Sequence, residues 1–338
     1  MGFLSDGQWH NKWYDTKASN GKFVRDTSRF RNWVTKDGSA GPSGDSGFRA
    51  ESGRYRLYVS LACPWAHRTL LYRQLKGLTE HIDVVVVEPH MLSNGWEFAG
   101  APDFGGHHIA GADREPGYGL HYLYQLYLKS DPQAHGRVTV PVLWDKQTET
   151  IVSNESSEII RMLNSAFDEI TGNTLDFYPE PLRNKIDETN AWVYDRINNG
   201  VYKTGFATTQ AAYEEAFADL FDALDMVDEI LGKQRYLVSS EGSGDQITEA
   251  DWRLFTTLIR FDSVYVGHFK TNKRKIDEFK HIPGYLRELY QQPGVAETVN
   301  MEHIKQHYYF SHDTINPTRV VPLGPDVDYT TAHGRGNF

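Results

Sequence analysis

The clearest hydrophobic pattern in the chain starts at residue 54, where short apolar runs alternate with a longer amphipathic one. Residues 54–60 (RYRLYVS) and 82–88 (IDVVVVE) predict strands, because β-branched, aromatic and other apolar residues dominate both segments. Residues 63–77 (CPWAHRTLLYRQLKG) predict a helix between them, with proline in its first turn. This order is typical of a β-α-β unit, in which the two strands run parallel.

A second group of elements follows an insertion at residues 89–136. Residues 138–145 (VTVPVLWD) and 148–153 (TETIVS) predict two strands around a short polar turn, and residues 156–167 (SSEIIRMLNSAF) predict an amphipathic helix. We therefore expect one α/β domain over residues 54–170, interrupted by the insertion.

The chain from residue 171 to residue 310 predicts an all-α domain. Apolar residues recur every three or four positions between residues 209 and 233, which predicts a helix with one buried face. They are Ala216, Phe217, Leu220, Phe221, Leu224, Val227 and Leu231. Thr248 and Asp251 have the spacing of a helix N-terminal cap and stand directly before another apolar run, WRLFTTLI.

The two ends of the chain lack a clear period. Residues 1–53 carry Trp and Phe at irregular spacing, which predicts neither helix nor strand but an ordered extension, because aromatic rings are costly to leave in water. From about Asn300 the sequence keeps many apolar residues but loses the helical period. We expect an extended arm there, with the C-terminal tail itself at residues 311–338.

Charge and composition exclude several classes of partner. The 338 residues include 35 Lys and Arg against 45 Asp and Glu, a net charge of −10, without a basic cluster suited to nucleic acid or an anionic membrane. The first 15 residues lack the features of a signal peptide, and no apolar run has the length of a membrane span. These features predict a cytoplasmic protein that binds neither nucleic acid nor membrane.

Cys63, the one cysteine of the chain, stands between a predicted strand and a predicted helix. The positive end of a helix dipole stabilises a thiolate, which makes such a cysteine a candidate nucleophile; a small buried apolar residue is the alternative. Ala66 occupies the position of the second cysteine in a Cys-x-x-Cys motif, so a resolving thiol has to come from outside, and glutathione is the abundant candidate. His67 and Arg68 either add charge stabilisation or are ordinary surface residues.

Two further segments offer groups that a tripeptide thiol needs. A cis bond between Val140 and Pro141 would expose the Val140 backbone to pair with glutathione, whereas a trans proline on an edge strand is the alternative. Glu155 and Ser156 open a predicted helix, whose first amides and Ser156 hydroxyl can bind the γ-glutamyl carboxylate while Glu155 pairs with its ammonium. Helix capping without a ligand is the alternative for both.

The order of elements, the insertion and the Thr-x-x-Asp cap together resemble the cytosolic glutathione transferases over most of residues 54–310. The stretches RYRLYVSLACPWAHR, NGWEF, GRVTVPVLWD and IVSNESSEIIRMLN are similar to the glutathionyl-hydroquinone reductases, or Xi-class transferases. The resemblance implies a thioredoxin-like α/β domain followed by an all-α domain, and a homodimer. It also implies an enzyme that removes glutathione from glutathionylated hydroquinones, with glutathione as co-substrate and no permanently bound cofactor.

The same resemblance implies roles for individual residues. Cys63 would be the nucleophile and Trp96 would pack near the glutathione sulfur, although an aromatic that pins a Gly-rich loop is the alternative for Trp96. The tripeptide would be bound by Val140, Glu155 and Ser156, with Arg137 as a partner for its glycyl carboxylate.

The acceptor region and the rival functions are less determined. Tyr194 and Tyr308 are candidates to hydrogen-bond the hydroquinone, with core packing as the alternative. His107, His108 and His121 lack paired ligand spacing, so no metal site is predicted. The rivals are an omega-like thiol transferase or dehydroascorbate reductase that uses the same cysteine, and a non-catalytic interaction protein on a transferase fold.

Overall fold

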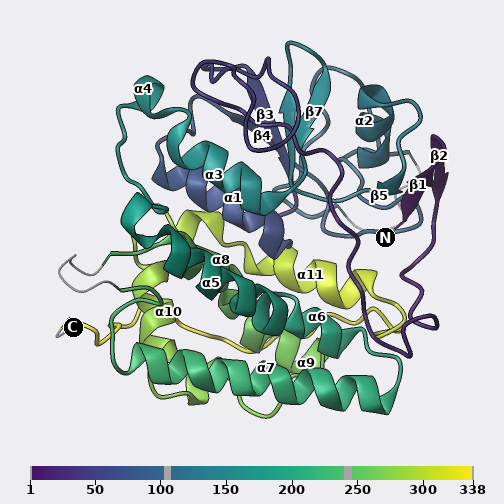
Figure 1. Cartoon of the computed structure of the whole chain (residues 1–338). Coiled ribbons are helices and arrows are strands. Elements are labelled where there is room, and N and C mark those ends of the chain that lie inside the picture. The colour runs from purple at the N-terminus through teal and green to yellow at the C-terminus, as the bar shows by residue number, and fades with distance from the viewer. Residues whose placement is uncertain (1, 103–107, 240–245, 337–338) are drawn as a thin grey trace. The chain divides into compact units, whose positions relative to one another are not determined.

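The structure, a computed structural model, describes residues 2–102, 108–239 and 246–336 (Figure 1). The chain forms two compact units. The sheet unit, which contains all the described strands, comprises Met1–Trp13, Asp26–Leu175 and Thr298–Val321. The helical unit comprises Tyr14–Arg25, Asp176–Glu297 and Pro322–Phe338. The domain boundaries expected from the sequence stay predictions, since these units group the chain by contact and not by continuous segments.

The sheet unit is built on a four-stranded sheet with the order β4-β3-β6-β7. Its strands are β3 (Tyr55–Val59), β4 (Asp83–Val86), β6 (Val142–Asp145) and β7 (Thr150–Ser153). β3 and β4 pair in parallel, which confirms the predicted β-α-β unit, and β6 runs antiparallel to both β3 and β7. The helices of this unit are α1 (Pro64–Leu75), α2 (Leu123–Ser130), α3 (Ser156–Ser165), α4 (Asp168–Thr171) and α11 (Met301–Ser311). α1 and α3 pack side by side (Figure 1).

A second, smaller sheet holds the N-terminus. β1 (Phe3–Ser5) pairs antiparallel with β2 (Gln8–His10) and, on its other edge, with β5 (Gly136–Arg137). The expectation of no strand in residues 1–53 is therefore wrong here. Asp6 and Gly7 form the two-residue turn with φ of 48° and 75°, and Asp-Gly is favoured in such hairpins because both central residues need a positive φ.

The N-terminal extension also adds backbone hydrogen bonds along the edge of β7. The Asn32 amide donates to the Val152 carbonyl (2.9 Å), and the Asn154 amide donates to the Phe30 carbonyl (3.1 Å). Because an open strand edge carries unpaired backbone groups, this pairing covers an edge that would otherwise face water or another chain.

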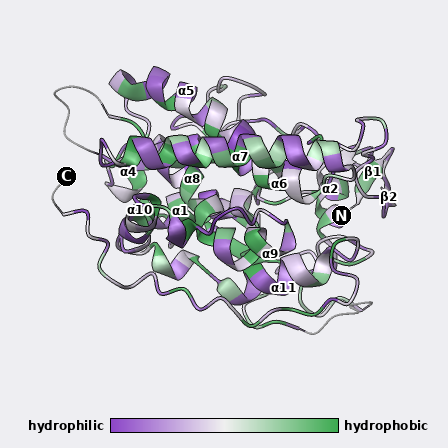
Figure 2. Ribbon diagram, turned by 90° about the horizontal axis from the view of Figure 1, so that it is seen from below, coloured by the Kyte–Doolittle hydropathy of each residue, from purple (hydrophilic) through white to green (hydrophobic). Residues whose placement is uncertain are grey.

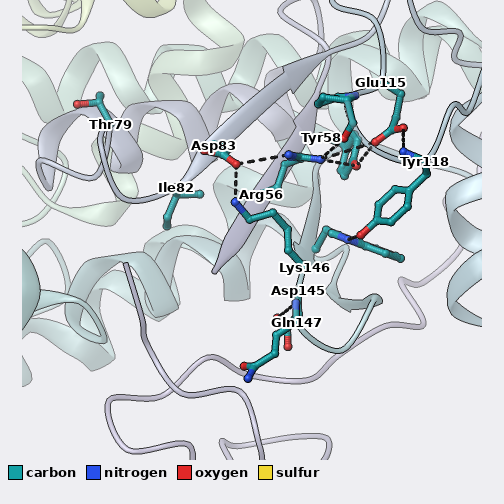
Figure 3. A network of polar contacts seen from close by, with 12 residues as sticks. Arg56, Tyr58, Thr79, Ile82, Asp83, Glu115, Tyr118, Asp145, Lys146 and Gln147 are labelled. Atoms are coloured by element: carbon teal, nitrogen blue, oxygen red, sulfur yellow. Dashed lines mark hydrogen bonds and ion pairs between the residues drawn. The ribbon is translucent and has the colours of Figure 1, made fainter. Parts of the chain in front are cut away.

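Polar side chains fasten the insertion to the sheet (Figure 3). The buried Glu115 carboxylate accepts hydrogen bonds from the Tyr58 hydroxyl (3.0 Å) and the Tyr118 amide (2.8 Å). Arg56 of β3 lies 3.7 Å from Glu115, and 3.5 Å from Asp83 of β4. The positive charge of Arg56 is attracted to the carboxylates of both Glu115 and Asp83. These contacts hold the insertion at Glu115 against β3.

The helical unit confirms the predicted all-α pattern of its main helices. They are α5 (Arg183–Val193), α6 (Gly200–Gly205), α7 (Gln210–Leu231), α8 (Glu249–Arg260), α9 (Val266–His268) and α10 (Ile282–Tyr290). Two π-helical turns, Tyr194–Asn198 and Phe261–Tyr265, continue α5 and α8. Single 3₁₀ turns lie at Glu180–Leu182, Ile276–Glu278 and Ala296–Thr298. Hydrophobic and hydrophilic residues alternate along α7 (Figure 2), and five of its seven predicted apolar positions are buried, Ala216 and Phe217 being half-buried.

α11 corrects the expectation of an extended arm from Asn300 onward. The Asn300 side chain caps this helix by accepting a hydrogen bond from the His303 amide (2.9 Å). The buried positions of α11 do follow a helical spacing, but two of the four, His303 and His307, are histidines beside Ile304 and Tyr308. Because two buried positions hold polar residues, the apolar residues alone do not show the helical period of α11.

The C-terminal segment is tied to the helical unit through Arg335. Its guanidinium, which is buried, donates to the carbonyl of Leu231, the last residue of α7 (3.2 Å), and to the Arg235 carbonyl in the chain that follows (2.6 Å). It also pairs with the buried Glu288 carboxylate (3.1 Å). A cation at a helix C-terminus is favoured by the helix dipole, so Arg335 stabilises the C-terminal end of α7.

The predicted cap at Thr248 and Asp251 is confirmed, and its carboxylate does more than cap α8. Oδ2 of Asp251 accepts from the Thr248 amide (2.8 Å) and hydroxyl (2.9 Å), and Oδ1 accepts from the Leu237 amide (2.9 Å) and the Tyr285 hydroxyl (2.8 Å). Burial raises the pKa of Asp251 against the effect of these donors. One carboxylate thus joins α8, α10 and the chain that precedes α8.

We expect Asp251→Ala to lower the free energy of unfolding by roughly 3–5 kcal/mol, because it leaves the buried donors of Thr248, Leu237 and Tyr285 without an acceptor. Tyr285→Phe, which removes a single donor, should cost only about 1 kcal/mol. Urea unfolding followed by tryptophan fluorescence measures both. Equal losses in the two variants would contradict the proposed joining role of the carboxylate.

Candidate active site

Cys63 is the N-cap residue of α1 and lies four positions after Val59, the last residue of β3. Its backbone is extended, with φ −77° and ψ 122°, and Pro64 is the first helical residue. The side chain is 9% exposed, and Sγ lies 3.7 Å from the Val140 carbonyl oxygen. The helix terminus favours a thiolate, whereas a thiol–carbonyl contact favours the protonated form, so the two neighbours act in opposite directions.

The Val140–Pro141 peptide bond is cis, the first of the two alternatives considered for this segment. β6 begins only at Val142, so the strand expected over residues 138–145 is shorter than predicted. The contact between Sγ and the Val140 carbonyl brings together two of the residues predicted for the site.

Glu155 and Ser156 lie together at the start of α3. Glu155 is the N-cap residue, and its Oε1 accepts from the Ser157 amide (3.1 Å) and hydroxyl (2.8 Å). Its Oε2 accepts from the Ser28 hydroxyl (3.0 Å) of the N-terminal extension. Ser156, the first helical residue, is buried. Glu155 therefore does cap the helix, while its second oxygen is held from a distant part of the chain.

The environment of Glu155 favours its ionised form. Burial acts to raise its pKa, but the hydrogen bonds from Ser157 and Ser28 outweigh burial and hold the pKa below its ordinary value. The positive charge of Arg68 on α1 acts in the same direction. A carboxylate is therefore present at neutral pH next to the N-terminus of α3.

His67 and Arg68 are both buried, contrary to the alternative that places them on the surface. His67 Nε2 lies 2.8 Å from the Thr298 hydroxyl. The Arg68 guanidinium lies 4.6 Å from the centre of the Trp65 ring. Of the two, Arg68 has a defined electrostatic effect on a predicted site residue, which is Glu155.

Trp96 and Arg137 have other neighbours in the sheet unit. Trp96 is buried and stacks on His307 of α11, with ring centres 4.7 Å apart and an interplanar angle of 23°. Arg137 donates to the Lys12 carbonyl (2.5 Å) and lies 3.3 Å from Asp26, so that the N-terminal extension holds its guanidinium. Their predicted contacts with glutathione stay predictions.

The two tyrosines predicted for the acceptor region lie in different units. Tyr308 of α11 is 1% exposed and packs edge-to-face on His307 (5.3 Å) and His312 (5.5 Å), which favours the core-packing alternative. Tyr194 starts a π-helical turn of the helical unit and is half-buried.

No group of three His, Cys, Asp or Glu side chains that could hold a metal lies in residues 2–102, 108–239 and 246–336. His107 falls outside these residues, and His108 contacts Glu88 (2.5 Å). Over the same described ranges, no helix combines the length and apolar character needed to cross a membrane.

Two residues near the predicted site carry no local signal in the sequence. Ser28 reaches Glu155 across a separation of 127 positions, and it lies in a segment without periodicity. Tyr127 contacts Thr139 and Asn154 through its hydroxyl, but it is one of 19 tyrosines and nothing adjacent distinguishes it. The positions of both residues depend on contacts with other segments. A pattern within one segment does not encode such contacts.

Comparison with known proteins identifies the family. A family model described as "Glutathione S-transferase, N-terminal domain" matches residues 62–166, and one described as "Glutathione S-transferase, C-terminal domain" matches residues 210–290. The chain is 56% identical over 335 residues to the glutathionyl-hydroquinone reductase YqjG of Escherichia coli, covering 99% of this chain and 98% of that protein.

Solved structures agree with this relationship. The glutathione-bound structure of Escherichia coli YqjG has a TM-score of 0.88 and 53% identity, covering 99% of both chains. The glutathione-S-transferase Xi of Phanerochaete chrysosporium has a TM-score of 0.83 and 51% identity, covering 91% of this chain and 94% of that one. Similarity of this extent over nearly the whole length shows that the chain belongs to the glutathione transferase family, in its Xi class of glutathionyl-hydroquinone reductases.

Proposed function

We propose that this protein reduces glutathionyl-hydroquinones to hydroquinones at the expense of glutathione, with Cys63 as the nucleophile. The observation that carries the proposal is the position of the one cysteine at the N-terminus of α1, 3.7 Å from the Val140 carbonyl. The relationship to YqjG, which is named a glutathionyl-hydroquinone reductase, supplies the substrate class.

The proposed reaction has two sulfur-transfer steps. The Cys63 thiolate attacks the sulfur that joins glutathione to the ring, so that an S–S bond forms, the C–S bond breaks, and the ring carbon takes up a proton. The thiolate of a second glutathione molecule then attacks the mixed disulfide, which releases glutathione disulfide and regenerates the Cys63 thiolate. The two electrons that reduce the ring come from the two glutathione sulfurs that end as a disulfide.

The start of α3 supplies the proposed γ-glutamyl site. The ionised Glu155 pairs with the ammonium, and the Ser156 hydroxyl with the first amides of α3 binds the carboxylate. The Val140 backbone pairs with the cysteinyl backbone as an added strand. Since the Val140 carbonyl lies beside Sγ of Cys63, glutathione held there has its sulfur within reach of the nucleophile.

For the other predicted site residues, the proposal rests mainly on the resemblance to the family. Trp96 is proposed to pack near the glutathione sulfur, and Arg137 to pair with the glycyl carboxylate in exchange for its contact with Asp26. Tyr194 is the better candidate of the two tyrosines for the hydroquinone hydroxyl, because Tyr308 is 1% exposed.

We also propose a homodimer in the cytoplasm. Membership of the family supports the dimer, and the need for reduced glutathione supports a compartment that keeps thiols reduced.

The test of the proposal compares three substrates at one glutathione concentration: a glutathionyl-hydroquinone, dehydroascorbate and a small mixed disulfide. We expect the highest kcat/KM with the glutathionyl-hydroquinone. Equal or higher efficiency with dehydroascorbate would support an omega-like activity of the same cysteine. Inactivity with all three substrates would favour a non-catalytic protein.

Because Cys63 is the one thiol of the chain, the second step needs glutathione from solution. Enzyme mixed with glutathionyl-hydroquinone alone should release one equivalent of hydroquinone and stop, with glutathione attached at Cys63. Intact mass spectrometry detects the adduct, and added glutathione should restart turnover. Cys63→Ser should give no burst, since a hydroxyl is a far weaker nucleophile than a thiolate near neutral pH. Full turnover without added thiol refutes the mechanism.

The contact from Ser28 to Glu155 should make stability depend on pH. Because the folded-state pKa of Glu155 lies below its ordinary 4.5, the ionised carboxylate stabilises the fold above that value, and the contribution is lost as the pH falls through the folded pKa. Ser28→Ala removes one donor, so it should cost about 1 kcal/mol at pH 7 and less at acidic pH. Urea unfolding at several pH values measures this, with the exposed neighbour Thr27→Ala as control. A cost independent of pH would show that Ser28 does not act through the carboxylate.

A further inference from the structure

The hydroxyl of Tyr127 lies between the two backbone segments proposed to bind glutathione. Tyr127 belongs to α2 in the insertion and is 3% exposed. Its hydroxyl donates to the Thr139 carbonyl (2.8 Å) and accepts from the Thr139 amide (3.2 Å). It also accepts from the Asn154 side-chain amide (3.1 Å). A hydroxyl has one proton and two lone pairs, so all its hydrogen-bonding capacity is used.

The two partners of this hydroxyl stand directly before the proposed binding residues. Thr139 precedes Val140, and Asn154 precedes Glu155. The two segments come from different elements, since one enters β6 and the other leaves β7 for α3. The Tyr127 hydroxyl therefore bridges them through bonds to the residue next to each site.

Asn154 extends the bridge to the N-terminal extension. It is 7% exposed. Its side-chain oxygen accepts from the Phe30 amide (3.3 Å), and its own backbone amide donates to the Phe30 carbonyl (3.1 Å). The rings of Phe30 and Tyr127 pack edge-to-face with centres 5.6 Å apart. The position of Asn154 is thus fixed from both sides, and movement of the α3 start relative to Thr139 would break several buried hydrogen bonds.

We propose that Tyr127 is a positioning residue that sets the spacing between Val140 and the start of α3, so that one glutathione molecule is bound at both places at once. The inference rests on the proposed function. A tripeptide that contacts two segments binds well only when their separation matches its own, and an error of a fraction of an ångström weakens both contacts together. Tyr127 does not itself touch the substrate in this role.

Tyr127→Phe removes the hydroxyl and keeps the ring, and Tyr124→Phe is the matched control. Tyr124 lies on the same helix, and within the described ranges its hydroxyl makes no hydrogen bond. Calorimetry with S-methylglutathione, which has no thiol to react, reports binding apart from chemistry. We expect Tyr127→Phe to raise its Kd and the KM for glutathione by about tenfold or more, with kcat at saturation changed by less than about threefold. Tyr124→Phe should leave all three unchanged.

A purely structural role predicts a lower melting temperature with an unchanged Kd at 25 °C, and that result would overturn the inference, as would an equal effect of Tyr124→Phe. If Tyr127→Phe does not fold, Asn154→Ser decides, since it removes the side-chain amide that donates to the Tyr127 hydroxyl (3.1 Å) and contacts the Thr139 hydroxyl (3.4 Å), and it should raise the Kd in the same way. An unchanged Kd in that variant would also overturn it. Binding of S-methylglutathione by the wild-type protein without reduction of glutathionyl-hydroquinone would refute the proposed substrate and leave this inference standing.

Discussion

A carboxylate largely removed from water needs hydrogen-bond donors or a compensating charge, and the arrangement of the sheet unit around the half-buried Glu155 meets that need. Burial alone would favour the neutral acid. Donors from Ser157 in the first turn of α3 and from Ser28, together with the charge of Arg68, reverse that preference. The groups that stabilise this one charge therefore come from three segments that are far apart in the sequence and meet at the start of α3.

The insertion contributes to the same region although it interrupts the domain in sequence. Glu115 fastens it to β3, and the Trp9 indole donates to the Ser93 carbonyl (3.0 Å). Its helix α2 carries the Tyr127 hydroxyl that bridges Thr139 and Asn154. An insertion anchored at several points has little freedom to shift, so it can hold neighbouring backbone segments at a fixed separation.

Local pattern was enough for much of this structure. The strands β3 and β4, the helix α7 and the cap at Thr248 follow from side chains within a few positions of one another, and the sequence predicts each of them. Cys63 could likewise be placed from the strand before it and the proline after it. The hairpin of β1 and β2 was missed although Asp6-Gly7 marks its turn, and α11 was missed because histidines occupy part of its buried face. Ser28 and Tyr127 could not be found in this way, because their partners lie in other elements.

The pairing of the N-terminal extension with β7 has a consequence for the order of events during synthesis. Ser28 leaves the ribosome more than a hundred residues before its partner Glu155, from which it is separated by 127 positions. The segment at residues 30–32 has no pairing partner until residues 152–154, at the end of β7, have emerged. Closing so long a loop late in translation leaves time for association with other chains or with chaperones. The start of α3 can therefore take its final form only after two segments that are synthesised far apart in time have met.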